Sequence, residues 1–159
     1  MMNFKKIILL MSISLLLFSC NSEDDICTGG EATPRLKMKF KNKITGKLKT
    51  LDSLYLMVDY GNGNFGTLTK GKTDSIFVPL RIDDSGYTDI YVKTTKNGNQ
   101  SKFRLNYQTK NQFVSPACGV KKLYENIQYN LLAPNPILDL ELSENQIINE
   151  NKTHLYLLF

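Results

Sequence analysis

Three aspartates lie close together in the middle of this sequence. Asp83, Asp84 and Asp89 lie within seven residues, with Ser85 and Gly86 between them. Carboxylate oxygens grouped around a glycine can bind Ca²⁺. The full calcium-loop pattern is absent, and aspartate, serine and glycine are also common in turns between strands. The pattern favours a turn and leaves an ion site at the three aspartates as the alternative, so we expect no metal and no other cofactor.

The single histidine, His154, is the other residue with obvious catalytic potential. An enzyme needs a nucleophile beside a base, paired carboxylates in a cleft, or a set of metal ligands. His154 lies in a strand-like segment without a recognisable partner motif. We therefore expect it at the rim of the core or partly buried, and we predict no catalytic residues and no enzyme activity.

Tyrosines offer a third kind of site. Carbohydrate-binding sandwiches stack sugars on exposed aromatic rings, and the chain has eight tyrosines and no tryptophan. Tyr55, Tyr87, Tyr91 and Tyr107 are the candidates for such a platform. Their alternate spacing predicts that most of them are core or cross-strand neighbours. A surface that binds glycans is therefore the alternative function, not the first one.

The N-terminal segment resembles a bacterial lipoprotein signal peptide. Lys5 and Lys6 precede an apolar run from Ile7 to Phe18, and Cys20 follows directly after Ser19. A run of this length is typical of a secretory signal and too short for a stable membrane span. We predict that residues 1–19 are removed and that Cys20 carries the lipid anchor. A plain signal peptide with an incidental cysteine is the alternative.

The two other cysteines, Cys27 and Cys118, are predicted to form a disulfide, because an exported protein meets oxidising surroundings. The bridge would close a loop of 118 − 27 = 91 residues. In the chain-entropy model such a loop is worth at most about 4.5 kcal/mol. The chain has no CxxC motif that would favour a reactive or metal-binding pair.

Length and charge indicate one exported domain. Removal of residues 1–19 leaves 159 − 19 = 140 residues with 18 basic and 15 acidic side chains. We expect an acylated, flexible acidic tether at 20–33 and a single domain at 34–159. The lysines are spread along the chain, which argues against nucleic acid as a partner. The acidic residues 23–25 either direct the protein to the cell surface or form a solvated spacer.

The rest of the chain has the pattern of short strands. Alternation is most regular in residues 36–41, where apolar residues alternate with lysines. Pro79 removes a hydrogen-bond donor, so the strand near it should be an edge strand or end there. Asn97 and Gly98 predict a type I′ hairpin turn. The expected strands are 36–41, 54–58, 76–80, 88–94, 102–107, 120–131, 137–142 and 153–159.

Residues 120–131 fit two patterns. Leu123, Tyr124 and Ile127 have helical spacing, whereas Tyr124 and Tyr129 suit a strand; the composition favours a strand. Seven or eight short strands without a helical period predict an all-β fold, an antiparallel β-sandwich that is immunoglobulin-like or similar.

With these residues in view, the chain resembles an uncharacterised family of Bacteroidota lipoproteins of the flavobacterial type, a domain of unknown function. The resemblance rests on Cys27 followed by Thr33-Pro34-Arg35-Leu36, and above all on Ser115-Pro116-Ala117-Cys118-Gly119. It implies location at the outer membrane and a neighbouring outer-membrane barrel protein as partner. No catalytic or binding residues come with it.

These observations together predict a lipid-anchored lipoprotein of the outer membrane that is surface-exposed or faces the periplasm. Its expected role is a non-enzymatic protein-interaction or structural accessory in the cell envelope. The expected contacts are the membrane through the N-terminal lipid and, as the resemblance implies, an outer-membrane barrel protein. Nucleic acid is not expected.

Overall fold

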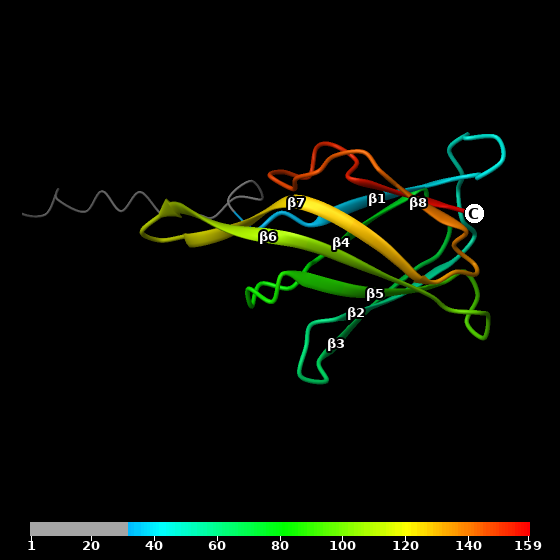
Figure 1. The fold of residues 1–159 in the computed structure, drawn as a ribbon, viewed down its shortest axis with the longest axis horizontal. Helices are drawn as coiled ribbons and strands as arrows, with labels where there is room; N and C mark the ends of the chain where they lie inside the picture. The colour runs from blue at the N-terminus through cyan, green and yellow to red at the C-terminus, as the bar shows by residue number, and fades with distance from the viewer. Residues whose placement is uncertain (1–31) are drawn as a thin grey trace, which may run out of the picture.

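The computed structural model describes residues 32–159, which form two β-sheets packed face to face (Figure 1). No helix in this part of the chain is long and apolar enough to cross a membrane. The described residues form nine strands: β1 (Leu36–Lys41), β2 (Leu54–Asp59), β3 (Phe65–Lys70), β4 (Ser75–Val78), β5 (Tyr87–Lys93), β6 (Ser101–Ser115), β7 (Gly119–Ala133), β8 (Asp139–Leu142) and β9 (Leu155–Leu158).

The smaller sheet has the order β4-β1-β9-β8 and the larger one the order β3-β2-β5-β6-β7. All pairs are antiparallel except β1 with β9, which are far apart in sequence and run parallel. The prediction of an all-β sandwich is confirmed. β4 is an edge strand and ends directly before Pro79, as the missing backbone donor of proline requires.

Alternation of apolar and polar residues produces the core. In β1, Leu36, Met38 and Phe40 are fully buried, while the lysines between them are partly exposed. β2 repeats this pattern. Because successive side chains of a strand point to opposite faces, each sheet presents one apolar face to the other. Both sheets supply the fully buried side chains, the largest of which include Tyr124, Phe40, Phe103, Leu36, Met38, Leu54 and Ile90.

The structure contains one strand that the sequence pattern did not predict. Residues 65–70 form β3, which pairs with β2 along its full length, from Asp59 opposite Phe65 to Leu54 opposite Lys70. The expected strands leave residues 59–75 as a loop, a stretch rich in glycine and asparagine. β3 lies at the edge of its sheet and is mostly exposed. It is thus defined by pairing with β2 and not by burial.

The hairpin between β5 and β6 is confirmed, but its predicted turn type is wrong. Seven residues, 94–100, connect the two strands, and neither Asn97 nor Gly98 has the positive φ of a type I′ turn. Instead the N–H of Gly98 donates to the carbonyl of Thr95 at 3.2 Å. A connection of seven residues can reverse the chain without the positive φ angles that a two-residue type I′ turn requires.

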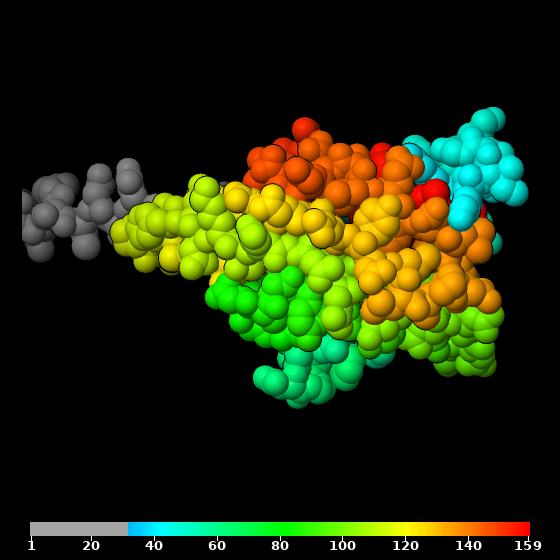
Figure 2. All heavy atoms as spheres, viewed as in Figure 1, coloured from blue at the N-terminus to red at the C-terminus, as the bar shows by residue number. Residues whose placement is uncertain are grey.

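β6 and β7 are much longer than predicted, at 15 residues each. Their outer parts leave the sandwich and project beyond the rest of the described chain (Figures 1 and 2). We call residues 108–123 the arm. Its ladder runs from Gln108 opposite Glu125 to Ser115 opposite Gly119. The Ser-Pro-Ala-Cys-Gly motif thus forms the turn at the tip of the arm.

A bulge explains the ambiguous spacing in β7. The register shifts between Asn106 and Gln108 on β6, and Asn126 on β7 has a φ of 55°, in the left-handed region. An extra residue in one strand changes which face the following side chains occupy. Tyr124 and Ile127 are therefore both buried although they are three residues apart. The prediction of a strand is confirmed.

Candidate functional site at the arm end of the sandwich

A hollow of about 440 Å³ lies at the end of the sandwich from which the arm projects. Four segments enclose it: the start of the described chain, the turn between β2 and β3, the connection between β4 and β5, and β7. Its lining is mostly apolar, with two arginines in the wall. The lining residues are Thr33, Pro34, Arg35, Tyr60, Asn64, Pro79, Leu80, Arg81, Ile82, Asp83 and Tyr124.

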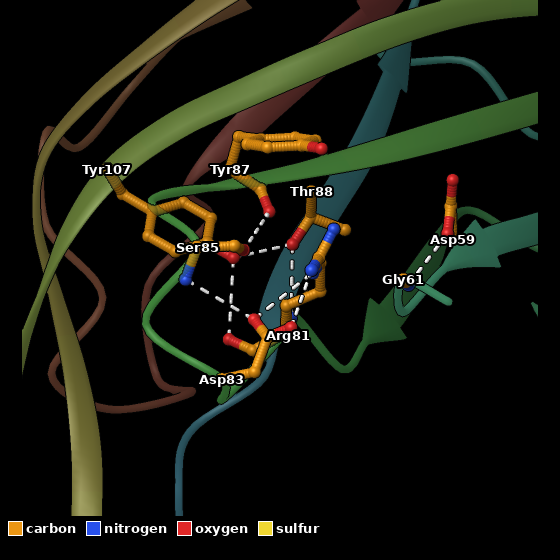
Figure 3. A network of polar contacts seen from close by, with 8 residues as sticks. All are labelled: Asp59, Gly61, Arg81, Asp83, Ser85, Tyr87, Thr88 and Tyr107. Carbon is orange, nitrogen blue, oxygen red and sulfur yellow. Dashed lines mark hydrogen bonds and ion pairs between the residues drawn. The ribbon is translucent and has the colours of Figure 1, made fainter. Parts of the chain in front are cut away.

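The connection between β4 and β5 is held by a network of polar contacts (Figure 3). The N–H of Arg81 donates to Oγ1 of Thr88 at 3.0 Å, and this hydroxyl lies 2.6 Å from the hydroxyl of Tyr107. The Tyr107 hydroxyl also reaches the carbonyl of Arg81, at 3.4 Å. Ser85 Oγ donates to the carbonyl of Tyr87 at 3.2 Å. These contacts fix this wall of the hollow without any ligand.

Arg81 is the most constrained side chain of that wall. Its guanidinium forms two hydrogen bonds to Asp83, at 3.1 and 2.5 Å, and lies over the ring of Tyr87. This pairing with Arg81 lowers the pKa of Asp83, and the bond to Asp83 raises the pKa of Arg81. The guanidinium of Arg81 lies close to the backbone of Gly61. Only glycine allows this, because a Cβ at residue 61 would lie 2.5 Å from Nη2 of Arg81. Gly61 also has a φ of 87°, which favours glycine.

Arg35 also lines the hollow and is paired as well. Its side chain makes two hydrogen bonds to Glu150, both 2.7 Å long, and its backbone N–H donates to the same carboxylate at 3.0 Å. The hydrogen bonds from Arg35 lower the pKa of Glu150. Both arginines of the hollow therefore face it with their charge already balanced by a carboxylate.

Tyr124 of β7 forms the floor. Its ring packs edge-on against Tyr107, with the centroids 4.9 Å apart. The two hydroxyls differ. That of Tyr107 bonds to Thr88, whereas that of Tyr124 is buried and has no hydrogen-bond partner within residues 32–159. Burial raises the pKa of Tyr107 to about 12 and raises that of Tyr124 further above its ordinary value. A buried hydroxyl without a partner is uncommon and costs stability.

The three aspartates proposed as an ion site do not converge. Asp83 pairs with Arg81, and Asp84 accepts from Thr109 at 2.5 Å and pairs with Lys122. Asp89 bonds Arg104 at 2.6 and 2.9 Å and Lys102 at 2.9 Å, on another face. Within residues 32–159 no three His, Cys, Asp or Glu side chains are placed to hold a metal. Each of the three carboxylates is thus paired with a cationic side chain of the protein.

The four candidate tyrosines divide between the core and the outer face of the larger sheet. Tyr107 is buried. Tyr55 and Tyr91 line a shallow hollow of about 280 Å³ on the outer face, together with Met57 and Lys93. Tyr87 carries the guanidinium of Arg104 at 4.1 Å from its ring centroid. Tyr107 thus belongs to the core, and Tyr55 and Tyr91 are half-buried neighbours on the outer face.

His154 is a structural residue of the smaller sheet. It is buried, and its Nδ1 accepts a hydrogen bond from the N–H of Lys37 at 2.9 Å. Its own N–H donates to the carbonyl of Lys37, also at 2.9 Å. Burial lowers the pKa of His154, which favours the neutral ring that this acceptor role requires. It lies outside the hollow.

The cysteines can be placed only in part. Cys118 lies in the turn of the arm, where its N–H donates to Oγ of Ser115 at 3.1 Å. Cys20 and Cys27 lie outside the described residues, as does the signal peptide. The lipidation of Cys20 and the disulfide between Cys27 and Cys118 stay predictions.

Sequence reasoning did not find the hollow. Arg35, Arg81 and Tyr124 belong to three segments that only folding brings together. One weak signal existed, because Thr33-Pro34-Arg35-Leu36 and Pro79-Leu80-Arg81 both place an arginine close to proline and leucine. Nothing in that similarity predicts that the two segments face each other.

The fold and the hollow define a nine-stranded β-sandwich with a projecting hairpin and a largely apolar pocket at its base. Residues 47–159 match the model of a family of unknown function, DUF6452, and the chain belongs to this family. The predicted membership in a family of unknown function is confirmed at that level. No curated protein and no solved structure matches the chain.

Proposed function

We propose that this chain is a lipid-anchored lipoprotein of the outer membrane and acts as a non-enzymatic protein-interaction module in the cell envelope. The observation that supports this role most directly is the arm. A hairpin that leaves its own sandwich buries less of its surface than the strands of the core, and such exposed elements commonly serve to contact a partner.

Two apolar side chains near the tip support a contact role. Phe113 is 67% exposed and Val120 is 58% exposed, and the two residues are opposite each other in the ladder. Residues directly opposite in an antiparallel pair project to the same face. The arm thus presents a small apolar surface that folding of the sandwich does not bury.

The charge of the hairpin complements an acidic partner. From Ile90 to Tyr124 the sequence has seven basic residues and no acidic one. Three of them, Lys110, Lys121 and Lys122, lie on the arm. Lys122 is paired with Asp84 at the base. The whole-chain charge conceals this local asymmetry, which would attract an acidic surface and fix its orientation.

The arm also projects from the end at which the described chain begins (Figure 1). The N–H of Lys122 donates to Oγ1 of Thr33 at 2.9 Å, so this beginning lies against the base of the arm. Eleven residues lie between Cys20 and Ala32, so these two residues can be at most about 40 Å apart. A lipid on Cys20 would keep the arm within that reach of the membrane, which favours an integral membrane protein as partner.

Site-specific photo-crosslinking in cells tests this function. A photoreactive amino acid at Phe113 should yield a crosslinked adduct with an integral membrane protein. Ile44, which is 95% exposed, is the matched control. The connection between β1 and β2 that contains it lies at the end of the sandwich opposite the arm (Figure 1, cyan). Equal labelling at both positions, or no adduct at Phe113, contradicts the proposal. Metabolic labelling with a fatty-acid analogue, lost in Cys20→Ala, tests the anchor separately.

Glycan binding is the second candidate, and one observation favours it. Tyr55 and Tyr91 share the shallow hollow on the outer face of the larger sheet, and Lys102 lies over the ring of Tyr91. A glycan array with the double variant Tyr55→Ala/Tyr91→Ala as control tests this. Binding that the double variant loses supports the candidate, and a silent array removes it.

A further inference from the structure

We propose that the shallow hollow on the outer face of the larger sheet, the outer-face hollow, binds an acidic polysaccharide. One uronic acid unit contacts Tyr55 and Tyr91, and its carboxylate bonds to Lys93 and Lys96. This inference rests on the glycan candidate of the proposed function, because it names the chemical class of that glycan. It is independent of the contact that the arm makes.

The strand register places the two tyrosines close together on the outer face. Tyr55 of β2 is opposite Lys93 of β5. Met57 of β2 is opposite Tyr91 of β5. Residues directly opposite in an antiparallel pair share a face, so the two rings occupy diagonal positions in adjacent rows. Both tyrosines line the outer-face hollow and are half-buried. They give it an aromatic surface of the kind against which sugar rings pack.

Lys102 leaves part of this aromatic surface open. Its ammonium lies over the ring of Tyr91, 5.1 Å from the centroid, and is held by Asp89 at 2.9 Å. Lys102 is not among the residues that line the outer-face hollow, whereas Tyr91 is. The part of Tyr91 that faces the hollow is therefore accessible to a ligand.

β3 supplies polar groups to one wall of the outer-face hollow. Thr67 is opposite Met57 in the ladder. Thr69 is opposite Tyr55, so both threonines project to the outer face. Both are exposed, as is Gln100, which adds an amide from the connection between β5 and β6. Hydroxyl and amide groups donate and accept hydrogen bonds. They match the hydroxyl groups that surround a sugar ring.

Charge distinguishes the outer-face hollow from the rest of the outer face. Around Asp89, the cations Lys102 and Arg104 are compensated by its carboxylate. The lining of the hollow instead includes Lys93 and Lys96 and no acidic residue. Neither lysine forms an ion pair with a carboxylate of residues 32–159. The hollow thus has a local excess of positive charge, which is complementary to an anionic ligand.

The position of Lys93 determines where the ligand carries its charge. Because Lys93 is directly opposite Tyr55 on the same face, an anionic group that bonds to it must be attached close to the ring that packs against Tyr55. A uronic acid has its carboxylate bonded directly to a ring carbon. The volume of about 280 Å³ is slightly below the range of about 300–1,000 Å³ for pockets that hold drug-sized ligands. The hollow therefore suits one sugar unit, with the rest of the polymer along the exposed sheet.

Three acidic trisaccharides and their methyl esters test the proposal. Trigalacturonate, trimannuronate and triguluronate are titrated by calorimetry into the purified, detergent-solubilised full protein. Their methyl esters keep the sugar rings and lose the charge. We expect at least one acid to bind saturably and about tenfold more tightly than its ester, the ratio that one charge-assisted hydrogen bond gives. No binding of any of the three acids, or equal binding of acid and ester, overturns the proposal.

Two lysine variants locate the charge that the ligand contacts. Lys93→Gln/Lys96→Gln should bind the acid as weakly as its ester. Lys47→Gln/Lys152→Gln removes the same charge from two exposed lysines outside the hollow and should retain the difference. Circular dichroism checks that each variant is folded. Equal losses in the two variants would show attraction by net charge alone and would also overturn the proposal.

The variant Tyr55→Ala/Tyr91→Ala separates this inference from the glycan candidate on which it rests. Acid and ester that bind equally, and that both fail to bind this variant, would retain the glycan candidate and refute the acidic class. No binding on the array and in the titrations would refute both. The crosslinking at Phe113 tests the arm, and its outcome does not depend on either result.

Discussion

The two halves of β6 behave as different regions of the molecule. In the body of the sandwich, Phe103 is completely buried between the sheets, whereas ten residues later Phe113 is 67% exposed on the arm. Both belong to the same continuous strand and pair with the same neighbour, β7. In the body β6 also pairs with β5, whereas on the arm it pairs with β7 alone. The smaller sheet covers only the body, and this cover buries Phe103.

This comparison shows that strand pairing and packing between the sheets have separate effects on β6 and β7. Pairing extends the hairpin as far as the ladder can continue, while packing stabilises only the part that the smaller sheet covers. A strand pair without an apolar face to cover it adds little to stability. The body should therefore determine the free energy of unfolding, and the arm should be available for binding.

The largest contrast is expected between two phenylalanine variants. Phe103→Ala should lower the free energy of unfolding by about 4 kcal/mol, because it removes a buried ring and leaves a cavity. Phe113→Ala should change it by less than about 0.5 kcal/mol. Urea denaturation followed by circular dichroism measures both. Similar losses in the two variants would show that the arm is part of the core.

The predicted disulfide would contradict this difference between a stabilising body and a non-stabilising arm. With the bridge in place, the arm would also contribute to the free energy of unfolding. If Cys27 and Cys118 are bridged, Cys118→Ser should lower the free energy of unfolding by about 3 kcal/mol. Reductant should destabilise the unaltered protein to the same level and leave the variant unchanged. Equal stability of the oxidised protein and the variant would contradict the bridge.

Loss of an ion pair on the body of the sandwich should give the next largest decrease in the free energy of unfolding. The side chain of Asp89 is 5% exposed beneath Arg104 and Lys102. Asp89→Asn should lower the free energy of unfolding by about 2 kcal/mol, less than for a fully buried pair, because both cations are partly exposed. Lys110, whose bond to Glu125 is exposed on the arm, offers the control Lys110→Gln, with little expected effect.

The same carboxylate predicts a pH dependence. The hydrogen bonds from Arg104 lower the pKa of Asp89 in the folded protein. A lowered pKa stabilises the fold above the ordinary value of about 4, and this stabilisation is lost as the pH falls from there through the folded-state pKa. Denaturation midpoints between pH 7 and pH 3 should therefore fall more for the unaltered protein than for Asp89→Asn. Parallel curves would contradict this.

The smallest effect separates the two stacked tyrosines. Tyr107→Phe should cost about 1 kcal/mol, because it removes a hydroxyl that bonds Thr88. Tyr124→Phe should cost nothing or stabilise slightly, because its hydroxyl has no partner. Thermal unfolding of both variants side by side measures the difference. A loss at Tyr124 as large as that at Tyr107 would show that its hydroxyl is satisfied in solution.

The sequence predicted the parts of the fold that depend on local alternation. β1 and β2 are evident because every second residue is apolar, and Pro79 marks the end of an edge strand through its missing donor. The candidate site was not predictable in the same way. Asp83 was a candidate because of its carboxylate. In the structure it pairs with Arg81 in the wall of the hollow, whose other lining residues the sequence did not indicate.

By itself, the sequence determined that this chain forms an all-β sandwich, because a two-residue period dictates which side chains are buried. Only the tertiary structure decided that residues 65–70 form β3, since an exposed edge strand depends on its partner. The tertiary structure also decided where β6 and β7 leave the core, since the length of the covering sheet sets that point. It brought Arg35, Arg81 and Tyr124 around one hollow, because contacts between distant segments have no local pattern.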